Sequence, residues 1–277
     1  MKQVRPKKNL GQHFLTDLTI ARRIADTVDE PYAELPVLEV GPGMGVMTQY
    51  LVEKPRQLKV VEIDRESVAY LHEHFPRLRE NILGEDFLRM DLRQVFGGGQ
   101  FVLTGNYPYD ISSQIFFKML DNRDLIPCCT GMIQHEVAVR MASQPGTKQY
   151  GILSVLLQAW CDVEYLFTVE PTVFNPPPKV LSAVIRLTRN ARQQLGCDEQ
   201  LFRRVVKAVF NQRRKMLRVS LRQLLPRDAG GADELFAHDF MTLRPEQLSI
   251  ADFVELTNRV EKALFADTIA PCANTAT

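Results

Sequence analysis

A short apolar run followed at once by closely spaced glycines is the feature that most constrains the fold of this chain. Val37-Leu38-Glu39-Val40 is a candidate buried strand, and Gly41-Pro42-Gly43-Met44-Gly45 follows it directly and opens a helix predicted to run to about Glu53. Glycines at this point allow the backbone to approach a ligand closely at the start of a helix. The pattern therefore predicts an α/β fold with a ligand site at the end of this strand.

A second strand that ends in acids indicates that the ligand is a nucleoside. This strand is predicted at Leu58 to Ile63, and Glu62 and Asp64 stand at its end, nineteen and twenty-one positions beyond Gly43. An acid at this place can hold the hydroxyls of a ribose. The dinucleotide-binding fingerprint fails, because Val46 occupies the place of its last small residue. The strand, turn, helix and acid together still favour nucleoside binding over a plain tight turn.

A third strand, Asn81 to Leu83, leads into two further candidate ligand contacts. Asp86 can accept a hydrogen bond from an adenine amine, and Phe87 can lie against the ring. A capping Asp and a core Phe is the alternative interpretation of this pair.

A fourth strand, Phe101 to Thr104, ends at Gly105 and delivers Asn106-Tyr107-Pro108-Tyr109. The side-chain carbonyl of Asn106, the rigid backbone carbonyl of Pro108 and the ring of Tyr109 suit a planar base with an exocyclic amine. Taken alone, this motif is more typical of an ordinary Pro turn with a packed Tyr. Its position at the carboxyl end of a strand in a nucleoside-binding sheet favours a binding site.

The order of elements predicts a doubly wound parallel sheet, because helix-like segments such as Ser67 to His74 follow the strands. Thr130 to Gln134 and Val180 to Leu187 are predicted as further strands, whereas Ser154 to Trp160 fits either a strand or a helix. After Arg192 the composition becomes helical and basic. We therefore predict a catalytic domain at 1–192 and a small all-α domain at 193–277.

Positive charge is clustered although the formal net charge is only +1. The first sixteen residues hold four Lys or Arg and no acid, and from Glu199 to Arg222 there are eight Lys or Arg against Glu199 alone. Such clusters are typical of proteins that bind a polyanion, although a solvated helix face is the alternative. The predicted contacts are Lys7, Lys8, Arg203, Arg204, Lys207, Arg213, Arg214 and Lys215.

The N-terminal segment Asn9 to Leu15 mixes polar and large apolar residues ahead of a helix-like run, Thr16 to Val28. Thr16 or Asp17 can cap this helix. The segment can fold over a ligand as a flap, or it can be an ordinary strap pinned by Phe14 and Leu15.

Composition limits the setting in which the chain works. Its 277 residues are 45% hydrophobic, and they include neither a membrane-spanning run nor a secretory signal. We expect a soluble cytoplasmic protein with no membrane association. The five cysteines form no C-x-x-C pair, so no metal site is expected.

The ordered motifs resemble a known family along nearly the whole chain. Glu39-x-Gly41-x-Gly43-x-Gly45 is similar to the loop of the S-adenosylmethionine-dependent methyltransferases. Eight blocks follow the order seen in the small-subunit (16S) ribosomal RNA adenine dimethyltransferases, the bacterial kasugamycin-sensitivity methyltransferase family: N-L-G-Q-H-F-L, V-L-E-V-G-P-G-M-G, V-V-E-I-D, G-E-D-F, G-N-Y-P-Y-D-I-S-S, Q-H-E-V-A-V-R-M, P-G-T-K-Q-Y-G and V-F-N-P-P-P-K-V-L-S-A-V.

This resemblance implies a Rossmann-like sheet, S-adenosylmethionine as cofactor, and a site assembled from motifs across the chain. The implied cofactor contacts are His13, Leu15, Gly41, Gly43, Glu62, Asp86, Phe87 and Asn106. The implied catalytic group is Asn106, Pro108 and Tyr109, with Phe174 closing the other face of the target base. Simple packing beside the prolines is the alternative for Phe174.

The implied reaction dimethylates two adjacent adenosines in the 3′-terminal hairpin of 16S rRNA, in a partly assembled small ribosomal subunit. Nothing in the sequence requires more than a monomer. The rival interpretations are a large-subunit methyltransferase of the macrolide-resistance type and a non-enzymatic nucleic-acid-binding factor. Tyr107 and His135 depart from the family pattern, and Tyr107 raises the question of pocket width beside the target base.

Overall fold

The computed structural model describes residues 13–225 and 231–265, which divide into two compact units. The first unit comprises 13–142 and 161–190, and the second comprises 143–160 and 191–265 without the undescribed gap. The chain therefore passes into the second unit twice. This division differs from the single boundary predicted at residue 192, because residues 143–160 also belong to the second unit.

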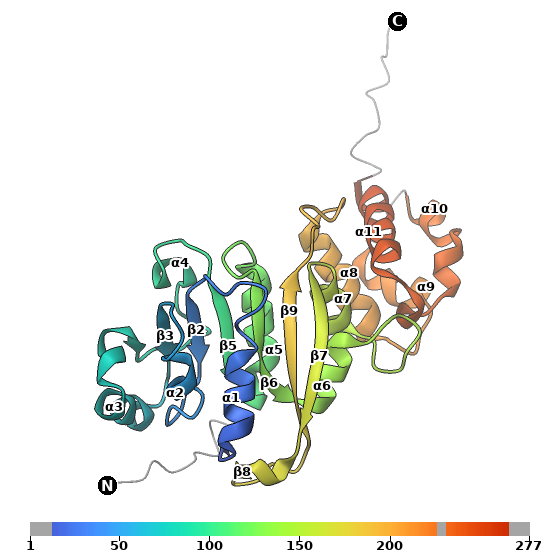
Figure 1. Cartoon of the computed structure of the whole chain (residues 1–277). Coiled ribbons are helices and arrows are strands. Elements are labelled where there is room, and N and C mark those ends of the chain that lie inside the picture. Colours follow the sequence, from blue (N-terminus) through green and yellow to red (C-terminus); the bar gives the residue numbers. More distant parts are fainter. Residues whose placement is uncertain (1–12, 226–230, 266–277) are drawn as a thin grey trace, which may run out of the picture. The chain divides into compact units, whose positions relative to one another are not determined.

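The first unit is built on a seven-stranded sheet with the strand order β4-β3-β2-β5-β6-β9-β7 (Figure 1). Strands β2 to β6 run parallel, while β9 pairs antiparallel with both β6 and β7. The predicted α/β sheet is thus confirmed, with an antiparallel pair at one edge. The bounds are β2 Val37–Val40, β3 Leu58–Val61, β4 Ile82–Leu83, β5 Val102–Asn106, β6 Cys128–Gln134, β7 Cys161–Val169 and β9 Ser182–Arg189.

The strand order reverses between β2 and β5, which lie side by side although β3 and β4 separate them in the sequence. In open α/β sheets, the crevice at such a switch point is where ligands bind. The strands there are apolar because both faces of the sheet are covered, and Val37, Leu38, Val102 and Leu103 are all buried.

The helices of the first unit follow the strands, as predicted. The α-helices are α1 Leu18–Asp26, α2 Thr48–Leu51, α3 Arg65–His74, α4 Leu92–Val95, α5 Ser112–Asp121 and α6 His135–Ala142, and the 3₁₀ turns are η2 Pro76–Asn81, η3 Tyr109–Ile111 and η4 Pro171–Val173. Asp17 caps α1 by accepting hydrogen bonds from the N–H groups of Thr19 and Ile20. The helix predicted from Gly45 to about Glu53 contains only the four α-helical residues of α2.

A separate two-stranded ribbon ties the N-terminal strap to the proline-rich segment. Strand β1 (Phe14–Leu15) pairs antiparallel with β8 (Phe174–Asn175). The N–H of Thr16 also donates to the carbonyl of Val173 at 2.8 Å. The described end of the predicted flap is therefore held down by main-chain hydrogen bonds, and the rest of it lies outside the described residues.

The described part of the second unit is helical. It comprises α7 Ile152–Gln158, α8 Glu199–Asn211, α9 Leu217–Ser220, α10 Ala232–Phe236 and α11 Ile250–Phe265, with 3₁₀ turns η5 Leu221–Leu224, η6 Asp239–Thr242 and η7 Pro245–Gln247. The segment Ser154 to Trp160, which fitted either a strand or a helix, is thus helical as far as Gln158. Aromatic rings from α8 and α11 form the core, where Phe210 and Phe253 lie 5.9 Å apart. None of the described helices is long and apolar enough to cross a membrane.

Candidate active site

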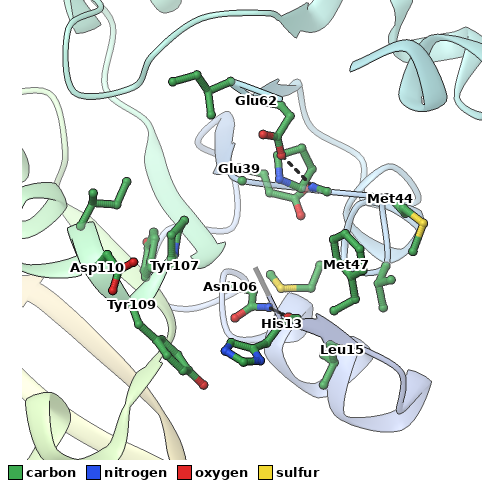
Figure 2. A pocket seen from close by; sticks show the side chains of 18 of the residues that line it. His13, Leu15, Glu39, Met44, Met47, Glu62, Asn106, Tyr107, Tyr109 and Asp110 are labelled. Atoms are coloured by element: carbon green, nitrogen blue, oxygen red, sulfur yellow. Dashed lines mark hydrogen bonds between the residues drawn. The ribbon is translucent and has the colours of Figure 1, made fainter. Parts of the chain in front are cut away.

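A cavity of about 230 Å³ opens in the first unit at the carboxyl ends of β2, β3 and β5 (Figure 2). The N-terminal strap forms one of its walls. Most of the site residues predicted from the sequence line this cavity, namely His13, Leu15, Gly41, Gly43, Glu62, Asp86, Asn106, Pro108 and Tyr109. The glycine loop, the acidic strand end and the Asn-Tyr-Pro-Tyr turn thus share one space.

The glycine loop has the backbone that its sequence predicted. Gly41 and Gly43 have φ angles of +69° and +57°, in the left-handed region that side chains disfavour. A Cβ atom on Gly43 would lie 3.3 Å from the ring of Phe14, and one on Gly41 would lie 3.7 Å from the ring of Pro108. The loop can therefore pack against both the strap and the Asn-Tyr-Pro-Tyr turn.

Glu62 is fixed at the end of β3 by two backbone donors. Its Oε2 accepts from the N–H of Gly43 at 3.0 Å, and its Oε1 accepts from the N–H of Asp64 at 2.9 Å. Burial raises the pKa of Glu62, and these two hydrogen bonds oppose the shift. A carboxylate held in this way keeps further lone pairs that can accept from the hydroxyls of a sugar.

Glu39 is a second buried carboxyl in the cavity wall, and it is not among the site residues predicted from the sequence. Its side chain is 1% exposed, and its Oε2 accepts from the hydroxyl of Thr48 at 2.7 Å. Burial raises the pKa of Glu39 to about 8; the Thr48 hydrogen bond opposes this shift and the charge of Glu62 adds to it. The sequence signal that could have indicated a site role for Glu39 is its charge in an otherwise apolar strand.

The third strand end places its two predicted residues differently. Asp86 lines the cavity, and its Oδ1 accepts from the N–H of Leu88 at 2.9 Å. Phe87 is 4% exposed and is not one of the residues that line the cavity. Its neighbour Leu88 and the exposed Ile63, which follows Glu62, do line the cavity, and neither is among the site residues predicted from the sequence.

Asn106 connects the catalytic turn to the strap. Its Nδ2 donates to the carbonyl of His13 at 3.3 Å, which leaves its Oδ1 as an acceptor beside the cavity. The Pro108 carbonyl accepts from the N–H of Ile111 at 3.2 Å, which begins η3. A carbonyl oxygen has two lone pairs, so Pro108 retains one for a ligand.

Tyr109 and His13 lie face to face at the same side of the cavity (Figure 2). Their ring centroids are 5.6 Å apart with an interplanar angle of 30°. The Tyr109 hydroxyl is anchored by the hydroxyl of Ser182 at 2.5 Å, and burial raises its pKa. His13 is held in turn by a 2.8 Å contact from its Nδ1 to the carbonyl of Pro176. Tyr109 therefore presents a fixed aromatic face on which a planar group can stack.

Tyr107, which departs from the family pattern, has its ring in the core. The side chain is 1% exposed, and its hydroxyl donates to the carbonyl of Thr130 at 2.9 Å. A Cβ atom on Gly131 would lie 2.7 Å from the ring, so the absence of a side chain there makes room for it. The tyrosine ring therefore packs against Gly105 of β5 and Gly131 of β6, where no side chain stands in its way.

Phe174 also lies in the core. It is 4% exposed, packs with Leu15, Ile24 and Met132, and is not among the residues that line the cavity. The structure therefore places its ring as the packing alternative describes. His135, the other departure, lies edge-on to Tyr165 with ring centroids 6.0 Å apart.

The predicted polyanion contacts lie in the second unit, except Lys7 and Lys8, which are outside the described residues. Helix α8 buries an apolar face that includes Phe202 and Val206, while Arg204 and Lys207 are exposed and Arg203 is half-buried. Arg214 and Lys215 are exposed beyond its end. The sixth residue, Arg213, donates to the carbonyl of Thr147 at 3.2 Å and lies 3.9 Å from Glu246.

Comparison with known proteins identifies the family. The profile of the family described as "Ribosomal RNA adenine dimethylase" matches residues 3–262. The chain belongs to the ribosomal RNA adenine dimethylase family. The resemblance found in the sequence motifs is thereby confirmed, and the match spans both units.

This member of the dimethylase family has close relatives and structural neighbours. It is 64% identical over 264 residues to "Ribosomal RNA small subunit methyltransferase A" of Bacteroides fragilis, covering 95% of both chains. The Flavobacterium johnsoniae protein of the same name is 52% identical, covering 94% of this chain and 98% of that one.

Two solved structures share the fold of this dimethylase family member. A dimethyladenosine transferase from Plasmodium falciparum matches with a TM-score of 0.74 and 23% identity, covering 91% of this chain and 98% of the other. The 23S rRNA methyltransferase ErmE matches with a TM-score of 0.61 and 28% identity, covering 90% and 99%.

Proposed function

We propose that the protein transfers methyl groups from S-adenosylmethionine to the exocyclic amines of two adjacent adenosines in the 3′-terminal hairpin of 16S rRNA, giving N6,N6-dimethyladenosine. The observation that carries this function is the shared cavity, into which the glycine loop, Glu62, Asp86 and the Asn-Tyr-Pro-Tyr turn all open. Membership of the ribosomal RNA adenine dimethylase family supports the reaction. The small-subunit name of its relatives supports the choice of substrate.

The residues around the glycine loop suit the cofactor. Glu62 holds the ribose hydroxyls, and Asp86 accepts from the adenine amine. The left-handed backbone at Gly41 and Gly43 allows close approach of the methionine part, which His13 and Leu15 cover from the strap. S-adenosylmethionine, when bound, supplies an activated methyl group on a sulfonium centre.

The Asn-Tyr-Pro-Tyr turn orients the target amine. The lone pair of an adenine amine is delocalised into the ring, so the enzyme must align and rehybridise the nitrogen. The Oδ1 of Asn106 and the carbonyl of Pro108 accept its two hydrogens, which directs the lone pair towards the methyl donor. Tyr109 stacks on the base, a contact that contributes about 1 to 3 kcal/mol. No strong base is needed, because the nitrogen carries a positive charge after methyl transfer and readily releases a proton to solvent.

The second unit holds the RNA. Arg203, Arg204, Lys207, Arg213, Arg214 and Lys215 contact phosphates, with Lys7 and Lys8 added from the N-terminus. The target base is flipped out of the hairpin into the cavity. In this proposal the enzyme acts as a monomer, since nothing in the sequence requires a partner subunit. The substrate is a partly assembled small ribosomal subunit, which places the reaction in the cytoplasm.

A methyl-transfer assay with three substrates tests this function. The protein is incubated with labelled S-adenosylmethionine and, separately, undermethylated small ribosomal subunits, large-subunit RNA and adenine-containing duplex DNA. We expect label on the small subunits alone. Label only on large-subunit RNA would contradict the substrate and favour an activity like that named for ErmE, and label on none would favour a non-enzymatic binding factor.

A further inference from the structure

Lys118 reaches from α5 to the chain segment that carries Asp86. Its Nζ donates to the carbonyl of Leu88 at 3.1 Å and to the carbonyl of Met90 at 2.5 Å. These two carbonyls are two residues apart, so a single ammonium group fixes the curvature of the loop between them. Hydrogen bonds from a charged donor are among the stronger ones in proteins.

Leu88 connects this ammonium group to Asp86. The N–H of Leu88 donates to the Oδ1 of Asp86 at 2.9 Å, while its carbonyl accepts from Lys118. The backbone of Met90 also donates to the carbonyl of Asp86 at 3.0 Å. Movement of Leu88 would therefore turn the Asp86 carboxylate, and both residues line the cavity.

The surroundings of Lys118 are those of a structural cation. Its Nζ lies 5.6 Å from the centre of the Phe87 ring, a cation–π contact. Burial lowers the pKa of Lys118, and the nearby charges of Asp86 and Asp91 oppose this shift. The Phe87 ring does not line the cavity, and it takes part in this cation–π interaction with the Lys118 ammonium group.

The same helix continues from the catalytic turn. Helix α5 follows η3, and the hydroxyl of its first residue, Ser112, donates to the carbonyl of Tyr109 at 3.1 Å. Lys118 therefore joins the Asp86 loop to the helix that begins behind Tyr109.

We propose that Lys118 is a positioning residue that holds Asp86 in the orientation needed to recognise the adenine amine of the cofactor. This role rests on the proposed function, because it assumes that the nucleoside in the cavity is an adenosine. Lys118 touches neither cofactor nor RNA in this role. It acts through the Leu88 peptide, in the way that outer groups orient the ligands of a binding site.

The binding affinities of the demethylated cofactor and of its deaminated analogue test this role. S-adenosylhomocysteine carries the adenine amine, and its deaminated form, S-inosylhomocysteine, carries a carbonyl in its place. We expect the wild-type protein to bind the adenosyl form more tightly than the inosyl form. Lys118→Met should lower the affinity for the adenosyl form roughly tenfold. The affinity for the inosyl form should fall much less, so that the protein's preference for the compound with the amine becomes smaller. Lys118→Arg should restore part of the preference.

Lys59 offers a matched control in the same unit. Its Nζ donates to the carbonyl of Val95 at 2.6 Å and lies 5.4 Å from the Phe96 ring, but none of these residues lines the cavity. Lys59→Met should lower thermal stability by a similar amount while leaving the binding of both compounds unchanged. A Lys118→Met, Asp86→Ala double variant should bind the adenosyl form no worse than Asp86→Ala alone.

Equal weakening of both compounds, or unchanged binding with lowered thermal stability, would overturn the role of Lys118. Because the binding measurement needs no RNA, it is separate from the methyl-transfer assay. A wild-type protein that prefers the adenosyl form but methylates no RNA would remove the proposed function and leave the role of Lys118 intact. A wild-type protein that binds neither compound would remove both.

Discussion

Asn106 lies where two segments far apart in the sequence meet, since its amide donates to the carbonyl of His13. That hydrogen bond orients the amide and leaves Oδ1 on the cavity side. The role of Asn106 as the acceptor for the target amine thus depends on the strap as well as on its own strand. A substitution at this one position should separate the binding of the cofactor from the chemistry.

We expect Asn106→Ala to retain cofactor affinity within a few-fold and to lose most of its turnover, because the lost acceptor acts on the target amine. The affinity is measured by calorimetry, and turnover is measured with undermethylated small subunits. Gln100→Ala is a suitable control, because the Gln100 amide donates to the carbonyl of Asp124 at 2.9 Å and neither residue lines the cavity. Unchanged turnover in Asn106→Ala would remove Asn106 from the mechanism.

The raised pKa of Glu39 predicts that the stability of the protein depends on pH. Its pKa is raised from 4.5 to about 8 in the folded protein, so between these values the folded chain binds the proton that the unfolded chain has lost. Stability should therefore fall as the pH rises through this window. In Glu39→Gln the neutral amide can still accept from Thr48, and its melting temperature should fall less than that of the wild type between about pH 5 and about pH 8. Parallel pH profiles for the two proteins would contradict this expectation.

The site residues that could be predicted from the sequence are those that follow the carboxyl ends of the parallel strands. Glu62, Asp86 and Asn106 line one cavity because the carboxyl ends of parallel strands meet at one edge of the sheet. Phe87 and Phe174 line no part of it, because the side that an aromatic ring buries depends on which neighbours cover it. Those neighbours come from distant parts of the chain, as Leu15 does for Phe174.

At the scale of the elements, the contact between β5 and β6 explains how Tyr107 fits. Two glycines face each other across these strands, since Gly105 is the register partner of Gly131. The Tyr107 ring fills the space that their missing side chains leave, and Phe116 of α5 lies edge-on to it at 5.6 Å. Tyr107 is also one of the residues that line the cavity, so its effect on pocket width stays a prediction.

Gly131→Ala should be strongly destabilising. The new methyl group would lie 2.3 Å from the carbonyl oxygen of Gly105 and 2.7 Å from the Tyr107 ring, and the φ angle of +150° adds strain. We expect a loss of about 2 kcal/mol or more in the free energy of unfolding, measured by denaturant titration. Gly84→Ala is the control, because its nearest neighbour would be 3.8 Å away. Equal stability of the two variants would show that the strands can separate to admit the methyl group.

Elements with a clear sequence pattern were easier to predict than those set by tertiary contacts. The capped helix α1 and the apolar strand β2 were predicted from local signals. The segment at Ser154 to Trp160 is mostly apolar, so its helical form, which extends to Gln158, could not be read from periodicity. The β1–β8 ribbon joins segments about 160 residues apart, and no local pattern indicates such a pairing.

At the scale of the whole molecule, the two units divide the proposed work between chemistry and RNA binding. The sequence located the basic helix, but it did not show that residues 143–160 belong to the same unit. The loop there is joined to its unit by non-local hydrogen bonds, such as that from the N–H of Gly146 to the carbonyl of Glu246 at 2.7 Å. Contacts between residues so far apart in the chain leave no mark in composition.

The basic surface predicts a salt-dependent affinity for RNA. Arg204 and Lys207 are exposed on α8, and we expect the double variant Arg204→Ala, Lys207→Ala to bind rRNA more weakly. The slope of log affinity against log salt should decrease by about one for each charge removed. Lys262→Ala, which removes an exposed lysine already paired with Glu234, should leave that slope nearly unchanged. An unchanged slope in the double variant would place the RNA contacts elsewhere.

The central claim is that one cavity, formed by the glycine loop and the Asn-Tyr-Pro-Tyr turn, dimethylates two adjacent adenosines of small-subunit RNA. The most direct measurement is mass spectrometry of the 3′-terminal hairpin from undermethylated small subunits treated with the protein and S-adenosylmethionine. We predict four added methyl groups, two on each of two neighbouring adenosines, and almost none with Asn106→Ala. Methylation of another nucleotide, or the same product from Asn106→Ala, would contradict the claim.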